Sequence, residues 1–232
     1  MIQRYAVNLA ALREEELVSC RAVLSEERRA KADRFRFEKD RIRCILAEAT
    51  VRYVMKISYG IDPQTVCIIQ DKKGRPMLAE PNDIPLDFNI SHAGDWVVCS
   101  IGSERSGIDI EHIADAKERL AEKVLSEREW NTWKALPPEE KPKAFYQIWT
   151  LKESYTKQTG DGLSQPFCEI ATEPTGTAAW RVIGDPERIM LSQRWGVDYY
   201  LSLCAPASAQ VSPEVILLDA RRMETFFQSG VL

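Results

Sequence analysis

The sequence lacks the features that mark several common classes of protein. No run approaches the roughly 18 apolar residues of a membrane-spanning helix, and the first residues carry charge without an apolar stretch. We therefore expect neither a membrane span nor a signal peptide. There is no P-loop and no Rossmann glycine fingerprint, which disfavours an ordinary nucleoside triphosphatase or dinucleotide oxidoreductase. The net charge of −4 disfavours general binding to nucleic acid or to a membrane surface.

Histidine and paired cysteine are also scarce. The two histidines are His92 and His112, and none of the six cysteines forms a CxxC pair, so a zinc site is not expected. Most cysteines lie in apolar runs, as Cys99 and Cys204 do. This placement favours buried, reduced thiols and a cytoplasmic protein.

What remains is an ordinary globular composition, with 232 residues, 44% hydrophobic and 28% charged. This length suits one large domain or two of roughly half that size. Asp95–Val98 resembles Asp198–Leu201 about one hundred residues later, which indicates two similar halves. We expect an N-terminal half over 1–104 and a C-terminal half over 105–232.

Local patterns predict an α+β fold in which each half packs a long helix on an antiparallel sheet. The long helices are expected at 40–58, ended by Gly60, and at 139–159, ended by Gly160 or Gly162. Ser25 is expected to cap a helix over 26–37. The shorter helices are expected at 11–22, 115–123 and 126–135. Strands are expected at 2–9, 65–70, 86–90, 96–101, 107–111, 167–172, 179–183, 188–194, 198–204 and 214–219. We expect 96–101 and 107–111 to form a hairpin.

The sharpest local feature is Gly107-Ile108-Asp109-Ile110-Glu111. On a strand, Asp109 and Glu111 share one face while Ile108 and Ile110 point into the core. Neighbouring carboxylates repel unless a cation lies between them, and an all-oxygen site suits Mg²⁺. The alternative interpretation is a solvated strand face.

A second feature is the segment from Trp149 to Lys157, which reads WTLKESYTK. On a helix, Trp149, Glu153 and Lys157 lie on one face. If this face meets the acidic strand, Glu153 adds a third carboxylate and Lys157 a cation. The alternative is an exposed Glu–Lys pair.

Phosphate-binding candidates lie upstream. Ser91 and His92 follow a predicted strand and could hold a phosphate, although an ordinary turn explains them equally well. Arg21–Arg43 carries nine cations against five acids. Lys31, together with Arg75 in the turn 74–76, could supply charge for a polyanion, whereas a solvated helix face is the alternative. Carboxylates and cations together indicate a Mg²⁺-dependent enzyme acting on a phosphate or pyrophosphate ester.

The segment 107–111, followed about forty residues later by 149–157, resembles the signature of the 4′-phosphopantetheinyl transferases. Residues 89–92 and 74–76 resemble the Sfp-type branch, which is monomeric with two pseudo-symmetric halves. The resemblance implies transfer of the 4′-phosphopantetheine arm of coenzyme A to a serine of an apo acyl or peptidyl carrier protein, with release of adenosine 3′,5′-bisphosphate. Carriers of fatty-acid, polyketide and nonribosomal peptide synthesis all present a similar serine.

The same resemblance assigns roles to residues, with the active site at the junction of the halves. Asp109, Glu111 and Glu153 would hold Mg²⁺. Glu153 would also be the base for the carrier serine, and Lys157 would stabilise or protonate the leaving phosphate. Coenzyme A would be contacted from the N-terminal half by Arg28, Lys31, Arg43, Gly74, Arg75, Pro76, Ser91 and His92. Of these, His92 would contact the 3′-phosphate, and residues 74–76 would border the adenine.

Some positions depart from the family pattern. Ala93 stands where many relatives have serine, and Arg28 and Arg75 stand where lysine is frequent, which keeps the charge but changes the geometry. Two other functions remain open on sequence grounds. They are a Mg²⁺-dependent pyrophosphohydrolase and a non-catalytic carrier-binding protein. We expect a carrier to dock along residues 113–125.

Overall fold

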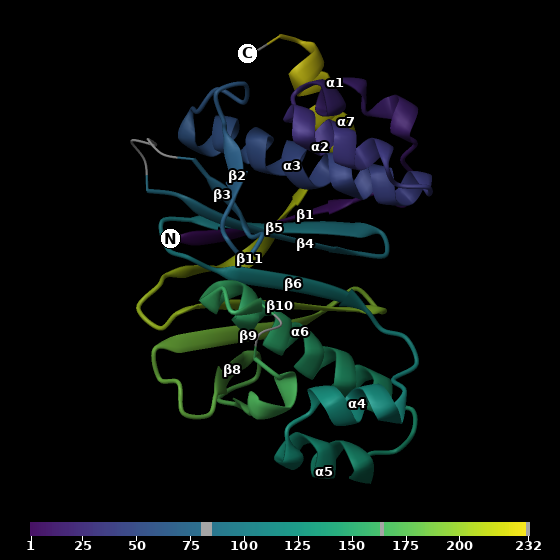
Figure 1. Ribbon diagram of the computed structural model, residues 1–232, viewed down its shortest axis with the longest axis vertical. Coiled ribbons are helices and arrows are strands. Elements are labelled where there is room, and N and C mark those ends of the chain that lie inside the picture. Colours follow the sequence, from purple (N-terminus) through teal and green to yellow (C-terminus); the bar gives the residue numbers. More distant parts are fainter. Residues whose placement is uncertain (80–84, 163–164, 231–232) are drawn as a thin grey trace. The chain divides into compact units, whose positions relative to one another are not determined.

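A computed structural model describes residues 1–79, 85–162 and 165–230, and its helices and strands are shown in Figure 1. The chain forms two compact units. The first unit comprises Ile2–Ser103 together with Val211–Leu232, and the second comprises Glu104–Gln210. The expected boundary near residue 104 agrees with this division. The expected C-terminal half, 105–232, does not, because the last segment of the chain folds with the first unit.

The first unit is built on a four-stranded sheet in the order β11-β1-β5-β4. Its strands are β1 (Ile2–Asn8), β4 (Asp87–Ala93), β5 (Trp96–Gly102) and β11 (Val211–Leu218). Strand β1 pairs antiparallel with β5 but parallel with β11, so the expectation of a purely antiparallel sheet is wrong at this edge. A separate antiparallel pair joins β2 (Ile68–Gln70) and β3 (Pro76–Leu78).

Helices cover one face of this sheet, with α3 lying along it (Figure 1). The helical segments are η1 (Glu14–Glu16), α1 (Val18–Ala22), α2 (Glu26–Asp33), α3 (Glu38–Tyr59) and α7 (Ala220–Gln228). The predicted caps are confirmed. The Ser25 side chain accepts from the backbone N–H of Arg28 at the start of α2, and Gly60 ends α3 at a φ of 72°, a conformation that glycine adopts without strain.

Helix α7 completes the core of the first unit. Met223 and Phe227 are buried in the same apolar cluster as residues of α1 and α3. The Glu224 carboxylate accepts the backbone N–H groups of Ser19 and Cys20, which satisfies donors at the start of α1. These contacts explain why the end of the chain belongs to the first unit.

The second unit carries a five-stranded antiparallel sheet in the order β6-β10-β9-β8-β7. Its strands are β6 (Gly107–His112), β7 (Thr172–Pro174), β8 (Ala179–Val182), β9 (Arg188–Trp195) and β10 (Tyr199–Pro206). Its helical segments are α4 (Glu118–Val124), α5 (Glu127–Ala135), α6 (Lys141–Thr159) and η3 (Phe167–Glu169). Helix α6 packs on the sheet and ends at Gly160, at a φ of 83°. The long helix on a sheet in each unit is as expected.

Strands β5 and β6 do not form the predicted hairpin. Strand β5 pairs with β1 and β4, whereas β6 pairs with β10. The polar segment between them therefore leads from one unit to the other. A turn signal indicates where a strand ends but not which strand it will pair with, and that is why the sequence pattern was misleading here.

All six cysteines are free thiols. Cys20, Cys44, Cys99 and Cys204 are buried, as expected, but Cys67 and Cys168 are exposed. Burial raises the pKa of the Cys99 thiol. In the described part of the chain, none of the helices is both long enough and apolar enough to cross a membrane.

Truncation of a buried α7 side chain tests the assignment of the C-terminal segment. Phe227→Ala is expected to lower the free energy of unfolding by about 3 kcal/mol, because it leaves a cavity in the core of the first unit. Urea denaturation followed by circular dichroism measures the change. Arg222→Ala, at an exposed position of the same helix, is the control. An equal effect of the two substitutions would contradict the packing described.

Candidate functional site

Helix α6 approaches strand β6 closely at Gly107. A β-carbon added at Gly107 would lie 2.0 Å from the carbonyl oxygen of Ser154 and 2.6 Å from the backbone nitrogen of Gln158. Both atoms belong to the helix backbone and cannot move aside without shifting the helix. Glycine is therefore required here for the helix to lie against the strand, which brings the two predicted motifs together.

The two motifs meet through Asp109 and Lys157. The Nζ atom of Lys157 lies 2.7 Å from Oδ1 of Asp109 and 3.2 Å from the carbonyl oxygen of Ile108. Asp109 is only 3% exposed, so the alternative of a solvated strand face is wrong. Lys157 reaches across to the strand, which also argues against a simple exposed pair with Glu153.

Two further carboxylates belong to the same electrostatic cluster. Burial raises the pKa of Glu111 to about 7, helped by the negative charges of Asp109 and Glu153, and Lys157 offsets part of this effect. Burial also raises the pKa of Glu153, followed by the charge of Asp109. The fold therefore holds Glu111 and Glu153 where the charge of Asp109 disfavours their ionisation, with the Lys157 ammonium group opposing this effect.

The donor set has the chemistry that a hard divalent cation prefers. Its three carboxylates repel one another, and a cation between them would relieve that repulsion. As the side chains now lie, no group of three or more histidine, cysteine, aspartate or glutamate residues within 1–79, 85–162 and 165–230 is arranged to hold a metal. The residue types fit Mg²⁺, but the carboxylates would have to converge on it.

A buried ion pair that the sequence analysis missed supports the other side of α6. Lys152 is fully buried, and its Nζ donates to Glu129 and to the carbonyl oxygens of Val124 and Phe167. Glu129 also accepts the backbone N–H and hydroxyl of Thr172. The network ties α6 to α4, α5 and β7. The Ser-x-x-Glu pattern at 126–129 signals the capping box of α5, but not this bond to Lys152.

Buried hydroxyls fix the contact between α6 and the sheet. The Thr150 hydroxyl lies 2.8 Å from that of Ser202, which in turn bonds Ser192. Ser202 is the cross-strand partner of Asp109, so Asp109 belongs to a polar row under the helix. Trp149 packs against Phe145 and Phe167, which confirms that its face of α6 is not solvated.

In the first unit, four of the predicted coenzyme A residues line one pocket. Its walls include Arg28, Lys31, Gly74 and Pro76, together with Ser25 and Glu48. Gly74 has a φ of 82° in the turn between β2 and β3, a conformation that favours glycine. Helix α2 therefore supplies the cations of this pocket, and the turn before β3 supplies another part of its wall.

The guanidinium groups of Arg75 and Arg43 donate hydrogen bonds to carboxylate and backbone oxygens of the first unit. Arg75 donates to the Asp87 carboxylate at 2.6 Å and to the carbonyl oxygen of Phe88 at 3.3 Å. Arg43 donates twice to the carbonyl oxygen of Gly94, at 2.9 and 2.6 Å, and once to Asp40. Neither residue lines the pocket described above. Arg43 instead holds the turn that follows β4.

Ser91 and His92 lie within strand β4 rather than after it, so the expected strand end is wrong. Successive residues of a strand point to opposite faces. Ser91 is accordingly buried and His92 exposed. The two side chains are not presented together on one face.

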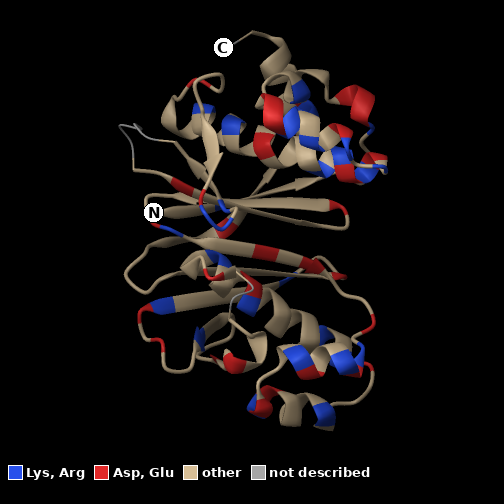
Figure 2. Ribbon diagram, in the orientation of Figure 1, with Lys and Arg blue, Asp and Glu red and all other residues tan. Residues whose placement is uncertain are grey.

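The basic segment of the first unit is largely paired with acids. Figure 2 shows acidic and basic residues interspersed over α1, α2 and the start of α3. Ion pairs in this region include Arg21–Asp33, Lys39–Asp95 and Arg41–Glu14. For most of these side chains the solvated, charge-paired alternative is therefore confirmed.

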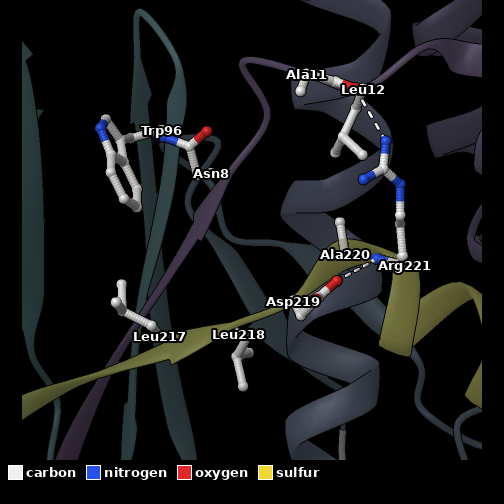
Figure 3. Close-up of a pocket in the computed structure, with 9 residues that line it drawn as sticks. All are labelled: Asn8, Ala11, Leu12, Trp96, Leu217, Leu218, Asp219, Ala220 and Arg221. Carbon is white, nitrogen blue, oxygen red and sulfur yellow. Dashed lines mark hydrogen bonds between the residues drawn. The ribbon is translucent and has the colours of Figure 1, made fainter.

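Another pocket of the first unit contains none of the predicted residues. Trp96 and Leu217 line one part of it and Asp219 and Arg221 another (Figure 3). Arg221 donates to the carbonyl oxygen of Ala11, and its backbone N–H donates to Asp219. The polar groups at this pocket thus serve the start of α7.

Two family models and two relatives that match this chain are all 4′-phosphopantetheinyl transferases. Residues 105–204 match the family model of the 4′-phosphopantetheinyl transferase superfamily, and residues 12–104 match that of the 4′-phosphopantetheinyl transferase N-terminal region. The 4′-phosphopantetheinyl transferase psf-1 of Bacillus pumilus is 30% identical over 203 residues, which is 84% of this chain and 85% of that one. The 4′-phosphopantetheinyl transferase Sfp of Bacillus subtilis (strain 168) is 34% identical over 156 residues, 67% and 69% of the two chains.

Among solved structures, a holo-(acyl-carrier-protein) synthase from Bacillus anthracis in complex with CoA (3′,5′-ADP) is similar to part of the chain. It matches at 22% identity and a TM-score of 0.38, and covers 45% of this chain and 96% of that one.

Removal of one clustered charge is expected to stabilise the fold. The folded state disfavours ionised Glu111, so the wild type is penalised most above the folded pKa of about 7. The penalty shrinks as the pH falls toward the ordinary value of about 4.5 for a glutamate. At pH 8 without divalent cations, Glu111→Gln is expected to raise the free energy of unfolding by about 1 kcal/mol after allowance for screening.

Thermal denaturation in EDTA at pH 8 and pH 5 measures this difference. Glu122→Gln, at an exposed position of α4, is the control and should change little. A Glu111→Gln protein less stable than the wild type at pH 8 would show that the carboxylates do not repel one another in the folded chain.

Proposed function

This chain belongs to the 4′-phosphopantetheinyl transferase family, and we propose that its β6–α6 site carries out the family's reaction. That reaction transfers the 4′-phosphopantetheine arm of coenzyme A to a serine of an apo carrier protein. The observation that carries the proposal is the gathering of Asp109, Glu111, Glu153 and Lys157 between one strand and one helix. They are the same four residues to which the resemblance to the family gives roles in metal binding and catalysis.

The proposed step is a displacement at phosphorus. The carrier serine oxygen attacks the phosphate that bears the pantetheine arm, and a new serine–phosphate ester forms. The bridging P–O bond of the pyrophosphate breaks, and adenosine 3′,5′-bisphosphate leaves. Glu153 accepts the serine proton, a role that suits a carboxylate whose pKa is raised. Lys157 stabilises the negative charge that gathers on the leaving phosphate.

Asp109, Glu111 and Glu153 would hold Mg²⁺. When bound, the ion would supply positive charge that offsets the pyrophosphate and the three carboxylates. Lys157 pairs with Asp109, which keeps its ammonium group beside the carboxylates that would hold the ion.

The pocket of the first unit would hold the adenosine end of coenzyme A. Arg28 and Lys31 supply charge for a polyanion, and Gly74 and Pro76 supply a wall for the adenine. Ser91 and His92 remain proposed phosphate contacts, with Arg43 acting on the adjacent turn and Arg75 at the edge of β3.

The alternatives carry less weight. A pyrophosphohydrolase would use water in place of the carrier serine, and intact-mass measurement separates the two, because only transfer adds a phosphopantetheine group to the carrier. A non-catalytic carrier-binding protein would not be expected to keep all four residues of the site. The Sfp-type branch that the sequence resembles is monomeric, so we propose a monomer, and the six free thiols favour the cytoplasm.

A carrier is proposed to dock on α4. Lys117, Arg119 and Lys123 are exposed there, and they would complement an acidic carrier helix. Leu120 is 40% exposed and offers an apolar contact, whereas Val124 and Leu125 are buried in the core. The docking surface is thus narrower than the expected segment 113–125. The carrier would belong to fatty-acid, polyketide or nonribosomal peptide synthesis.

Charge reversal tests the docking surface. Lys117→Glu with Lys123→Glu is expected to raise the KM for the carrier about tenfold, because like charges would then meet, while coenzyme A binding stays unchanged. Steady-state kinetics with varied apo carrier measure this effect. Lys143→Glu, a reversal on α6 outside the proposed surface, is the control. An unchanged carrier KM would remove α4 as the docking site.

Replacement of the proposed base tests the reaction itself. Glu153→Gln keeps the size of the side chain but removes its charge and its basicity, so kcat for carrier loading is expected to fall about a hundredfold or more. Coenzyme A binding, which is proposed to rest on the first unit, should change much less. Intact-mass analysis of the carrier measures loading. Glu139→Gln, at an exposed position just before α6, is the control, and near wild-type loading by Glu153→Gln would refute the proposed role.

A further inference from the structure

A buried carboxylate lies in the wall of the first unit's pocket. Glu48, on α3, is 1% exposed and lines the same pocket as Arg28. It accepts the backbone N–H of Ser25 at 2.8 Å, the Ser25 hydroxyl at 3.2 Å and Nε of Arg28 at 3.3 Å. It also accepts two N–H groups of Arg52, at 2.9 and 2.7 Å. A carboxylate is an unexpected neighbour for a polyanion and requires an explanation.

The charge of Glu48 is balanced by Arg52. Arg52 is 3% exposed and divides its donors between Glu48 and the carbonyl oxygen of Pro63. Burial alone would raise the pKa of Glu48, but the Ser25 amide and the Arg52 and Arg28 cations outweigh it, and the net pKa is lowered. Glu48 is therefore ionised, and the group of Glu48, Arg52 and Arg28 keeps one positive charge.

That remaining charge belongs to Arg28. Its side chain is 17% exposed, and its Nε is directed at Glu48. Within the described residues, its terminal nitrogens make one weak hydrogen bond, from Nη1 to Sγ of Cys44 at 3.9 Å, which is beyond the distance of a strong hydrogen bond. An unrestrained arginine has many rotamers, and fixing one in advance lowers the entropy cost of binding a ligand.

We propose that Glu48 is a positioning residue that aims the guanidinium of Arg28 at an anionic group of coenzyme A. This inference rests on the proposed function, in which Arg28 contacts the polyanionic substrate. Glu48 holds Nε of Arg28 and, through Ser25, the start of the helix that carries Arg28. The same carboxylate thus fixes both the backbone and the side chain of the phosphate-binding arginine.

The proposal predicts whether neutralising Glu48 makes coenzyme A binding weaker or stronger. If Glu48 acted only through its negative field, its neutralisation would strengthen the binding of a polyanion. If Glu48 aims Arg28, the same change weakens binding, because the guanidinium is no longer fixed. Glu48→Gln separates the two because it keeps the size of the side chain and removes the charge.

Isothermal titration calorimetry with coenzyme A and the full chain provides the measurement. Glu48→Gln is expected to weaken coenzyme A binding about tenfold, the scale of one charge-assisted hydrogen bond. Because Arg52 loses the negative charge of its partner, the variant will also melt at a lower temperature, so binding is measured well below Tm on protein that circular dichroism shows to be folded. Glu224→Gln removes a partly buried carboxylate of the same unit that caps α1 and does not line the pocket, so it should leave coenzyme A affinity unchanged.

A double-mutant cycle separates positioning from general loosening of the fold. In the Arg28→Gln background, Glu48→Gln is expected to cause little further loss of affinity, since the side chain that it aims is gone. A merely structural effect would weaken binding equally in both backgrounds. Should Glu48→Gln not fold, Glu48→Asp replaces it in the cycle, because it keeps the charge but shortens the reach to Arg28.

The outcomes distinguish the two proposals. A wild-type chain that does not bind coenzyme A overturns the proposed function. A wild-type chain that binds it, with Glu48→Gln binding equally or more tightly, overturns the positioning role and leaves the function standing. An equal loss with and without Arg28 also overturns the positioning role.

Discussion

The close packing of α6 on β6 at Gly107 is the constraint on which the proposed catalytic site depends. With no side chain at Gly107, the helix backbone lies against the strand, and Lys157 reaches Asp109 at 2.7 Å. The same approach brings Glu153 into the field of Asp109 and Glu111, so the carboxylates are held against their mutual repulsion. The buried Lys152–Glu129 network on the other side of α6 opposes that repulsion by fixing the helix to its neighbours. The fold thus maintains an electrostatic arrangement that is unfavourable by itself, as functional sites often do.

The second unit holds like charges together, whereas many charges of the first unit are paired. Its cations are numerous, but many of them bind acids or carbonyl oxygens of the fold, as Arg75 does with Asp87 and Arg43 with Gly94. A polyanion would therefore meet a small number of oriented cations rather than a broad positive surface. Arg28 and Lys31 line the pocket, and the buried pair Glu48–Arg52 stands behind Arg28. Orientation of a few charges costs less stability than the accumulation of many.

The sequence predicts the features that depend on residues close together in the chain, such as helix ends and the face on which a side chain lies. Alternation over 107–111 and the four-residue spacing of Glu153 and Lys157 place these side chains correctly, and Ser25 and Gly60 mark real helix ends. The resemblance to the transferase family predicts which of these residues act together. Contacts between distant segments are not visible in such patterns. The parallel pairing of β11 with β1 and the bond of Lys152 to Glu129 join residues far apart in the chain, and local periodicity contains no information about either. The pattern also predicts that β4 ends before Ser91, whereas Ser91 and His92 lie within it, one buried and the other exposed.

The most direct test of the central claim is a calorimetric titration of Mg²⁺ into the chain in the presence of coenzyme A, with the heat of Mg²⁺ binding to coenzyme A alone subtracted. The account predicts saturable binding to the wild type and a loss of affinity of about tenfold or more in Asp109→Asn, which keeps the shape of the side chain but removes one of the three charges. Binding to Asp109→Asn as tight as to the wild type would show that the β6–α6 carboxylates do not hold the metal.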